Sequence, residues 1–450
     1  MDSPSRARQD RGIQSGIFKL SDDVLSSIFI LSDLPLLASH ICNHWRAVAL
    51  GYPALWNTLV LNHQTYPLSS SIERITTLLA RSRASPLTID LKFGKDPDQV
   101  QAFLKILGLV LPHAGRWRHL YVSTDDDYSV AHLYHQIQHL SVPILEHFSV
   151  NADLTTGVLT NDLPRIGVSP LEGGIFTGGA PMLAAFRAFG TVSDYFQPDL
   201  SNITSLYIRG QKIFATSPEY FCNILSLPHL ECLSLSGGQE SEDSFLAAAT
   251  SRRSQPIVMS RLKHLHFDIY RPLALSNLFT MAVTPNLQSL LLVDYEIPRT
   301  VDFSAISFAN VIQLRFMGCY GGGATASNDI PFLALFPNVR HIILSAGSFP
   351  SRVCPHLLRD AATGSKLLPN LLTFSCVRGS PWDLRNVQQN IGKWRDGLLV
   401  NPTAEEIAQL EVTRNLPEIG WDHGWKFPSD PIFFDERLCT RGDEFISRDI

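Results

Sequence analysis

One short phrase recurs through most of the chain and limits what the chain can fold into. Written as apolar-x-x-apolar-x-apolar, it is clearest at residues 287–292, inside the segment Thr-Pro-Asn-Leu-Gln-Ser-Leu-Leu-Leu-Val. Successive copies begin 20 to 38 residues apart, and most follow a proline or asparagine. A period of this size is the signature of stacked repeats. The ten copies begin at Trp117, Leu145, Leu183, Ile203, Leu230, Leu262, Leu287, Val311, Val339 and Leu371.

The spacing inside the phrase predicts a strand with one buried face. Alternate side chains of a strand point to opposite faces, so Leu233 and Leu235, or Leu290 and Leu292, should face a core. Segments with helical spacing lie between several copies and could cover that core, at 100–111, 218–227, 274–283 and 355–368. Stacked units of strand, turn and helix with a parallel sheet are therefore expected. An ordinary α/β domain with apolar parallel strands is the alternative.

The phrase resembles the Leu-x-x-Leu-x-Leu core of the leucine-rich repeats in a degenerate form. The asparagine or cysteine that closes the turn in that family is mostly missing here. The resemblance implies an α/β leucine-rich-repeat solenoid over residues 85–380, with the parallel sheet on its inner surface. Residues 86–91 are expected to form its first strand, and residues 71–84 an amphipathic helix leading into it.

A second informative stretch runs from Leu20 to Trp56. Ser21 is a good helix N-cap, and the apolar residues after it repeat at helical spacing. A second helix is expected over residues 36–50, ended by Gly51 and Pro53. Such a small helical domain has too little volume to bury all its large apolar side chains, so some should be exposed for a partner. The alternative is a helical cap that shields the first repeat.

This stretch resembles an F-box, and it is most similar to F-box proteins of mushroom-forming fungi, which often carry degenerate leucine-rich repeats. Ser21 stands where the family has proline, and the segment 31–39 is a few residues short. The resemblance implies an adaptor-binding surface that includes Leu20, Val24, Leu25, Ile28, Ile41 and Trp45. The residues that match the family pattern are Leu20, Leu25, Ile28, Phe29, Ile41, Cys42, Trp45, Arg46, Ala49, Pro53, Leu55 and Trp56.

The expected organisation has five parts. Residues 1–16 form a disordered leader, 17–65 an F-box-like helical domain, and 66–84 a linker helix. Residues 85–380 form the repeats, and 381–450 a C-terminal cap and tail.

Composition is that of a soluble folded chain, with 45% apolar and 18% charged residues. A net charge of −5 gives no general attraction to nucleic acid or anionic membranes, and no run reaches the ~18 apolar residues of a membrane span. The polar N-terminus does not resemble a secretory signal. Seven scattered cysteines are typical of free thiols in the cytoplasm or nucleus.

No residue pattern indicates catalysis, a cofactor or a metal. His132, His135 and His139 share a helix face, but no fourth ligand lies near them in the sequence, so a half-buried face is favoured. The run Asp125–Asp127 lacks the spacing of a calcium loop. Arg441–Asp443 matches an adhesion motif, but chance is favoured in a chain with no secretion signal. An enzyme hidden in residues 381–450 stays an alternative.

Outward-pointing residues of the strands should line the open face of the sheet and bind a target protein. Aromatic and arginine side chains commonly anchor interfaces. The expected target-binding residues are Tyr207, Arg209, His266, Tyr270, Arg315 and Met317. The preferred hypothesis is a noncatalytic substrate-recognition subunit of a cullin-RING (SCF-type) ubiquitin ligase, which binds a Skp-type adaptor and an unknown target. The alternative is a leucine-rich-repeat scaffold not linked to ubiquitin.

Overall fold

The structure is a computed structural model of the chain, and it divides into two compact units, Met1–Leu183 and Ala184–Ile450. We describe each unit by itself. The described residues are 20–32, 35–62, 68–152, 174–190, 196–210, 218–237, 255–269, 272–293, 296–297, 308–317, 320–321, 329–345, 368, 370, 373–377 and 411–414. The predicted leader and the helix expected at 355–368 lie outside these residues, except for Leu368.

The first unit begins with short helices packed around a small core. They are α2 (Asp22–Ser32), α3 (Pro35–Ile41), α4 (Asn43–Gly51) and the 3-10 turn η1 (Pro53–Trp56). The prediction of one helix over 36–50 was wrong. Cys42 adopts an extended conformation, and its sulfur accepts a hydrogen bond from Trp45 N, so it ends α3 and caps α4. The core consists of Leu25, Phe29, Ala38, Val48, Ala49, Leu55 and Trp56.

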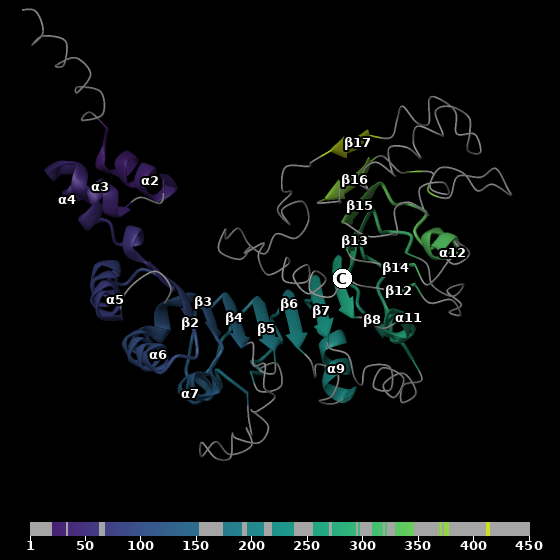
Figure 1. Cartoon of the computed structure of the whole chain (residues 1–450), viewed down its shortest axis with the longest axis horizontal. Coiled ribbons are helices and arrows are strands. Elements are labelled where there is room, and N and C mark those ends of the chain that lie inside the picture. The colour runs from purple at the N-terminus through teal and green to yellow at the C-terminus, as the bar shows by residue number, and fades with distance from the viewer. Residues whose placement is uncertain are drawn as a thin grey trace, which may run out of the picture. The chain divides into compact units, whose positions relative to one another are not determined.

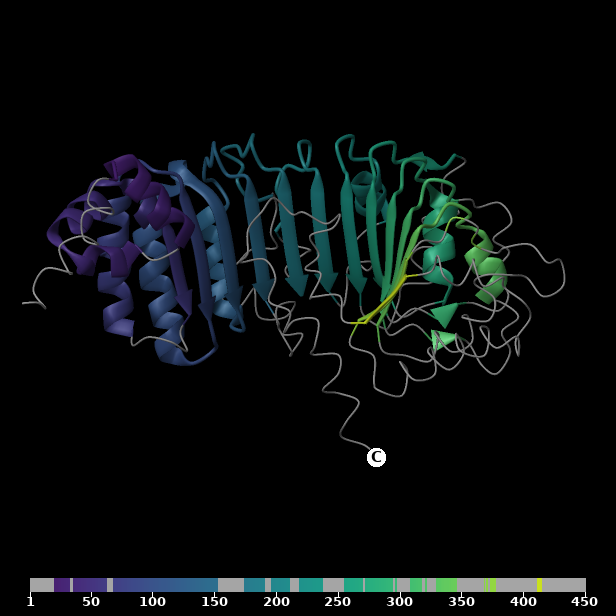
Figure 2. The same cartoon turned by 90° about the horizontal axis from the view of Figure 1, so that it is seen from above.

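A parallel sheet follows in the order β1 (Thr58–Asn62), β2 (Leu87–Phe93), β3 (Trp117–Thr124) and β4 (His147–Ala152). Residues 87–91 of the predicted segment 86–91 do lie in a strand, β2, but the prediction that this strand would be the first was wrong, because β1 precedes β2 and pairs with it. Helices α5 (Leu68–Ser82), α6 (Pro97–Val110) and α7 (Asp127–Ile137), with the 3-10 turn η2 (Leu111–Arg116), complete the unit. Figures 1 and 2 show these helices side by side along one face of the sheet.

The second unit continues the pattern of parallel strands in chain order. Its sheet runs β5 (Ala185–Gly190), β6 (Ser205–Gly210), β7 (Cys232–Gly237), β9 (His264–Ile269), β11 (Ser289–Val293), β13 (Gln313–Met317), β15 (His341–Ser345), β16 (Thr373–Val377), β17 (Glu411–Arg414). Helices α9 (Pro218–Leu225), α11 (Pro272–Met281) and α12 (Asp329–Ala334) lie between strands (Figure 1). Two-residue strands pair as β8 (Ile257–Val258) with β10 (Ala282–Val283), and β12 (Glu296–Ile297) with β14 (Tyr320–Gly321).

All ten copies of the phrase coincide with strands, from β3 to β16. Equivalent positions pair across neighbours, as Leu233 with Leu265 and Leu290 with Leu314. The fourth and sixth positions are buried, as predicted, wherever the structure describes their side chains, and Leu233, Leu235, Leu290 and Leu292 are all 0% exposed. The chain is therefore an α/β fold with a long parallel sheet and N-terminal helices.

The proline-asparagine cue before many copies has a structural role. The first apolar residue of the phrase closes a turn, as when Leu287 N donates to Thr284 O. The asparagine side chain then donates to a backbone carbonyl in the turn of the preceding copy. This bond runs from Asn286 to Ser260, from Asn310 to Pro285, from Asn338 to Ala309 and from Asn370 to Pro337. Each of these four turns is thereby bonded to the preceding turn at one edge of the sheet.

Strand β17 lies in the region predicted to be a cap and tail, where it pairs with β16 and extends the sheet. The helices expected at 382–399 and 404–410 lie outside the described residues. No helix in the described part of the chain combines the length and apolar character needed for a membrane span.

Candidate functional site

The N-terminal helices carry a cluster of large apolar side chains that face solvent. Because α2 buries only Leu25 and Phe29 among its large apolar residues, the rest of its apolar positions remain outside the core. Leu31 is 87% exposed, and Ile41 is 61% exposed. Isolated exposed apolar residues are ordinary, but a group on two short helices is typical of a protein-binding surface. We call this group the helical apolar surface: Val24, Ile28, Ile30, Leu31, Leu36, Leu37 and Ile41.

The structure divides the six predicted adaptor-binding residues into two sets. Val24, Ile28 and Ile41 are exposed and belong to the helical apolar surface. Leu25 is fully buried, and Leu20 and Trp45 are half-buried against the same core. The Trp45 ring lies 5.1 Å from the ring of Phe29. Leu25 therefore supports the surface from beneath and cannot contact a partner in this conformation.

The core of the N-terminal helices also contacts helix α5, which lies in the segment predicted to be a linker helix. Trp56 Nε1 donates to Ala49 O at 2.7 Å inside the core. The guanidinium carbon of Arg81, on α5, lies 4.5 Å from the centre of the Trp56 ring, a cation–π distance. Leu78 of α5 packs against the same core. These contacts hold the exposed helices on a defined support.

The predicted target-binding residues lie on strands of the second unit, but they are not uniformly accessible. Arg209 is exposed and Tyr207 is half-buried. His266 and Arg315 are only 6% and 8% exposed, which contradicts the expectation that they line an open face. Parallel register places their neighbours alongside them at about 4.8 Å, so long side chains screen one another. Tyr270 and the side chain of Met317 lie outside the described parts of the structure.

Serines and ionisable residues on β7 and β9 form paired contacts on this strand face. Ser234 Oγ lies 2.7 Å from His266 Nδ1, and Ser236 donates to the Asp268 carboxylate. Burial, aided by the charge of Arg209, lowers the pKa of His266 to about 3, whereas burial raises the pKa of Asp268. Cys232, the first residue of β7, also has a shifted pKa, because burial raises the pKa of its thiol to about 11.

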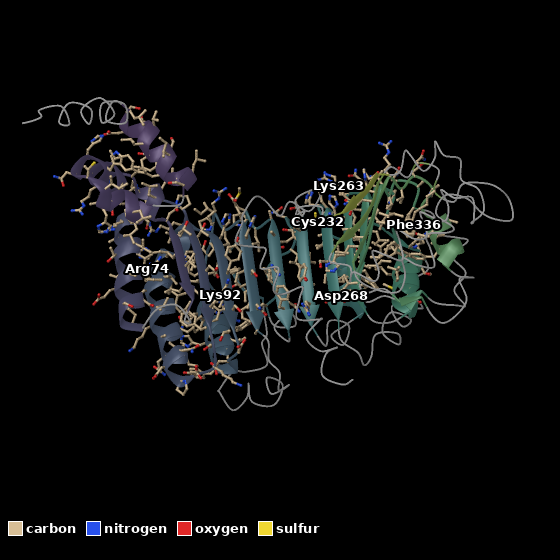
Figure 3. The ribbon with its side chains drawn as sticks, turned by 45° about the horizontal axis from the view of Figure 1, so that its top comes forward. Arg74, Lys92, Cys232, Lys263, Asp268 and Phe336 are labelled. Carbon is tan, nitrogen blue, oxygen red and sulfur yellow. The ribbon has the colours of Figure 1, made fainter. Side chains whose placement is uncertain are left out.

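Charged residues stand on the edge where these strands begin. Lys263 Nζ lies 2.8 Å from Glu231 Oε2. Figure 3 shows Lys263 and Cys232 near this edge and Asp268 farther along its strand. The pair is about 40% exposed on both sides, so solvent screens it and it contributes little to stability.

The histidines singled out on the α7 segment do not gather as ligands. His132 is half-buried, with its ring stacked on Tyr128, and His135 is exposed. His139 lies 3.0 Å from the hydroxyl of Thr177. Asp126 is the N-cap of α7 and accepts from Ser129 N at 2.7 Å, which gives the acidic run a structural role.

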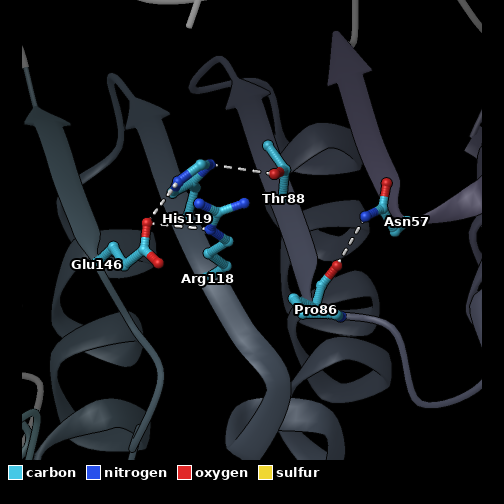
Figure 4. A network of polar contacts seen from close by, with 6 residues as sticks. All are labelled: Asn57, Pro86, Thr88, Arg118, His119 and Glu146. Atoms are coloured by element: carbon cyan, nitrogen blue, oxygen red, sulfur yellow. Dashed lines mark hydrogen bonds and ion pairs between the residues drawn. The ribbon is translucent and has the colours of Figure 1, made fainter. Parts of the chain in front are cut away.

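A different group of donors comes together on β3 and beside β4. His119, Glu146 and His147 each offer one atom, and these atoms lie within 4.8 Å of one another. Arg118 Nε lies 3.0 Å from Glu146 Oε2, and Thr88 Oγ1 lies 3.2 Å from His119 Nδ1, as Figure 4 shows. The sequence prediction missed this group because it sought ligands along one helix. The sequence does contain a signal for this group. When the copies that begin at Trp117 and Leu145 are aligned, Arg118 falls opposite Glu146 and His119 opposite His147.

Comparison with protein-family models and with curated proteins finds no match to this sequence.

Proposed function

We propose that this protein is a noncatalytic substrate receptor of a cullin-RING ubiquitin ligase, acting in the cytoplasm or nucleus. In this proposal, an F-box formed by α2, α3 and α4 binds a Skp-type adaptor. The repeats, a degenerate leucine-rich solenoid, hold a target protein. The receptor accelerates ubiquitin transfer by holding its target near the ligase, and proximity alone gives large rate gains.

The observation that carries the proposal is the helical apolar surface. Seven large apolar side chains face solvent on two helices that already possess a packed core beneath them. A cap that only shielded a repeat would bury such side chains against that repeat. Full burial of one of them against a partner would contribute about 1.5–3 kcal/mol. Their exposure on a firmly supported element therefore favours adaptor binding over a capping role.

On the repeats, Arg209 and Tyr207 remain the best supported target contacts. Arg187 approaches the same place, with its guanidinium carbon 4.1 Å from the Phe189 ring centre and 4.8 Å from that of Tyr207. Arginine stacked on aromatic rings is common among residues that dominate binding energy. The proposal places target recognition at β5 and β6 and leaves His266 and Arg315 as internal residues.

Adaptor binding by the full-length chain tests the proposal. Ile28→Asp and Leu37→Asp each place a charge within the helical apolar surface, and each should weaken binding to a recombinant Skp-type adaptor at least tenfold, because loss of one buried contact amounts to about 1.5–3 kcal/mol. Affinity is measured by isothermal titration calorimetry.

Met182→Asp provides the control, because Met182 is 55% exposed but lies outside the helices. It should bind the adaptor like the wild type. No measurable adaptor binding by the wild-type chain would reject the ubiquitin-ligase role and favour the scaffold alternative. Equal binding by the wild type, Ile28→Asp and Leu37→Asp would show that the adaptor does not bind at the helical apolar surface.

A further inference from the structure

The donor group on β3 and β4 is built from two neighbouring copies of the repeat. His119 pairs in register with His147 on the adjacent parallel strand, which points both rings to the same face of the sheet. Their ring centres are 4.6 Å apart and nearly parallel, with an interplanar angle of 27°. Glu146 directly precedes His147 and reaches the same place, with Oε2 3.7 Å from His119 Nε2.

The distances are close to those of a metal-binding site. Zinc bonds to imidazole nitrogen and carboxylate oxygen are about 2.0–2.2 Å, so tetrahedral ligand atoms are separated by roughly 3.4 Å. The His119–Glu146 separation is already near this value at 3.7 Å. The three ligand atoms lie within 4.8 Å of one another, so small side-chain rotations would bring them onto one ion.

Neighbouring groups would orient two of the ligands. Thr88 Oγ1 lies 3.2 Å from His119 Nδ1, which leaves His119 Nε2 directed at Glu146 (Figure 4). A hydrogen bond on the second ring nitrogen is the usual way in which a protein fixes a histidine ligand. Arg118 donates to Glu146 Oε2 and holds that carboxylate in place, although its positive charge lowers the affinity for a cation.

We propose that His119, Glu146 and His147 form a Zn²⁺-binding site on the strand face of the first unit. Two imidazoles and one carboxylate are a common ligand set for zinc, with the fourth position open to water or to a donor group from a partner. The side chain of His119 is 12% exposed and that of Glu146 is 33% exposed, so an ion can reach the site from solvent. The site crosslinks two successive repeats and does not depend on the proposed ubiquitin-ligase role.

Metal titration of the full-length chain tests this site. After treatment with a chelator, the wild type should bind one equivalent of Zn²⁺ in competition with a chromophoric indicator. It should also give the visible absorption of tetrahedral Co²⁺ when cobalt is substituted. Glu146→Gln and His119→Gln should each weaken Zn²⁺ at least about 100-fold, since loss of an orienting group alone costs 10- to 100-fold. Thr88→Val should weaken it about tenfold or more, because it removes the group that orients His119.

The double variant His132→Gln/His135→Gln supplies the matched control, because it removes two histidines on α7 and leaves the proposed ligands intact. Its Zn²⁺ affinity should equal that of the wild type. The proposal is overturned if the wild type binds no Zn²⁺, if Glu146→Gln and His119→Gln bind it as tightly as the wild type, or if the α7 variant loses the cobalt spectrum.

Discussion

At the scale of single residues, the repeats contain buried ionisable groups that a simple apolar pattern does not anticipate. His266 occupies an outward position of its strand yet is buried beside Ser234 and the Tyr207 ring. Arg209 is the charged group that acts on it, and both burial and that charge favour the neutral imidazole. Neutral histidine in the folded state makes stability depend on pH.

His266 should make the second unit sensitive to acid. Its pKa is about 3 in the folded state, against an ordinary value of 6.5. Between these values the unfolded chain binds one more proton than the folded chain, so stability falls as pH falls from about 6.5 toward 3. His266→Asn should reduce the slope of unfolding free energy against pH by up to about 1.4 kcal/mol per pH unit. Urea denaturation at several pH values measures the slope.

Gln136, an exposed residue of α7 that carries no titrating group, offers a comparison for this experiment. Gln136→Asn should leave the slope unchanged. Equal slopes for the wild type and His266→Asn would show that the imidazole protonates without unfolding the chain.

At the scale of elements, the asparagine side chains form hydrogen bonds between turns of neighbouring repeats, so the turns contribute to stability. Asn338 is involved twice, because its amide donates to Ala309 O and its carbonyl oxygen accepts from Asn370 Nδ2. Among the described residues, the Asn286 side chain makes one hydrogen bond, to Ser260 O at 2.6 Å. A hydrogen bond contributes about 0.5–1.5 kcal/mol net, so these turns add measurable stability.

Removing these amides should therefore destabilise the second unit in proportion to the bonds lost. Asn338→Ala should lower the free energy of unfolding by about 1–3 kcal/mol, and Asn286→Ala by about half as much. Chemical denaturation measures both values. Asn223→Ala, at an exposed position of α9, should have little effect. A loss no greater for Asn338→Ala than for Asn223→Ala would contradict a stabilising role of the turns.

Sequence reasoning located the strands well because the apolar period constrains them directly. Alternation along the strand places residues such as Leu290 on the face that packs against the core, so their burial could be predicted from the phrase alone. The break at Cys42 was missed, because apolar spacing continues through it and only the backbone conformation reveals it. Burial of His266 and Arg315 was also missed, since it depends on side chains from neighbouring strands that no single segment contains. The grouping of His119 with Glu146 required the strand register.

At the scale of the whole molecule, each described strand of the long sheet pairs, within its unit, only with its neighbours in a sheet order that follows the chain. Contacts between strands therefore join mainly neighbouring repeats, and stability should be approximately a sum of repeats and their interfaces. A large core defect should then weaken nearby strands more than distant ones.

Leu290→Ala provides this defect, because Leu290 is fully buried on β11. Such a truncation costs about 2–5 kcal/mol. Hydrogen exchange measured by mass spectrometry should show the greatest acceleration in β9, β11 and β13, and much less in β1, β2 and β3. Equal acceleration in both units would show that the chain unfolds in a single cooperative step.

The asparagine bonds between turns have a consequence for which insertions and deletions such a chain can accept during evolution. The asparagine bonds align consecutive repeats at the end where each strand begins. The length of the segment that leads from the end of one strand to the start of the next is therefore only loosely restricted. Gains and losses of sequence there leave the spacing of the strands intact. The uneven distance between the copies joined in this way, from 24 to 32 residues, is the expected outcome of joining at one edge of the sheet alone.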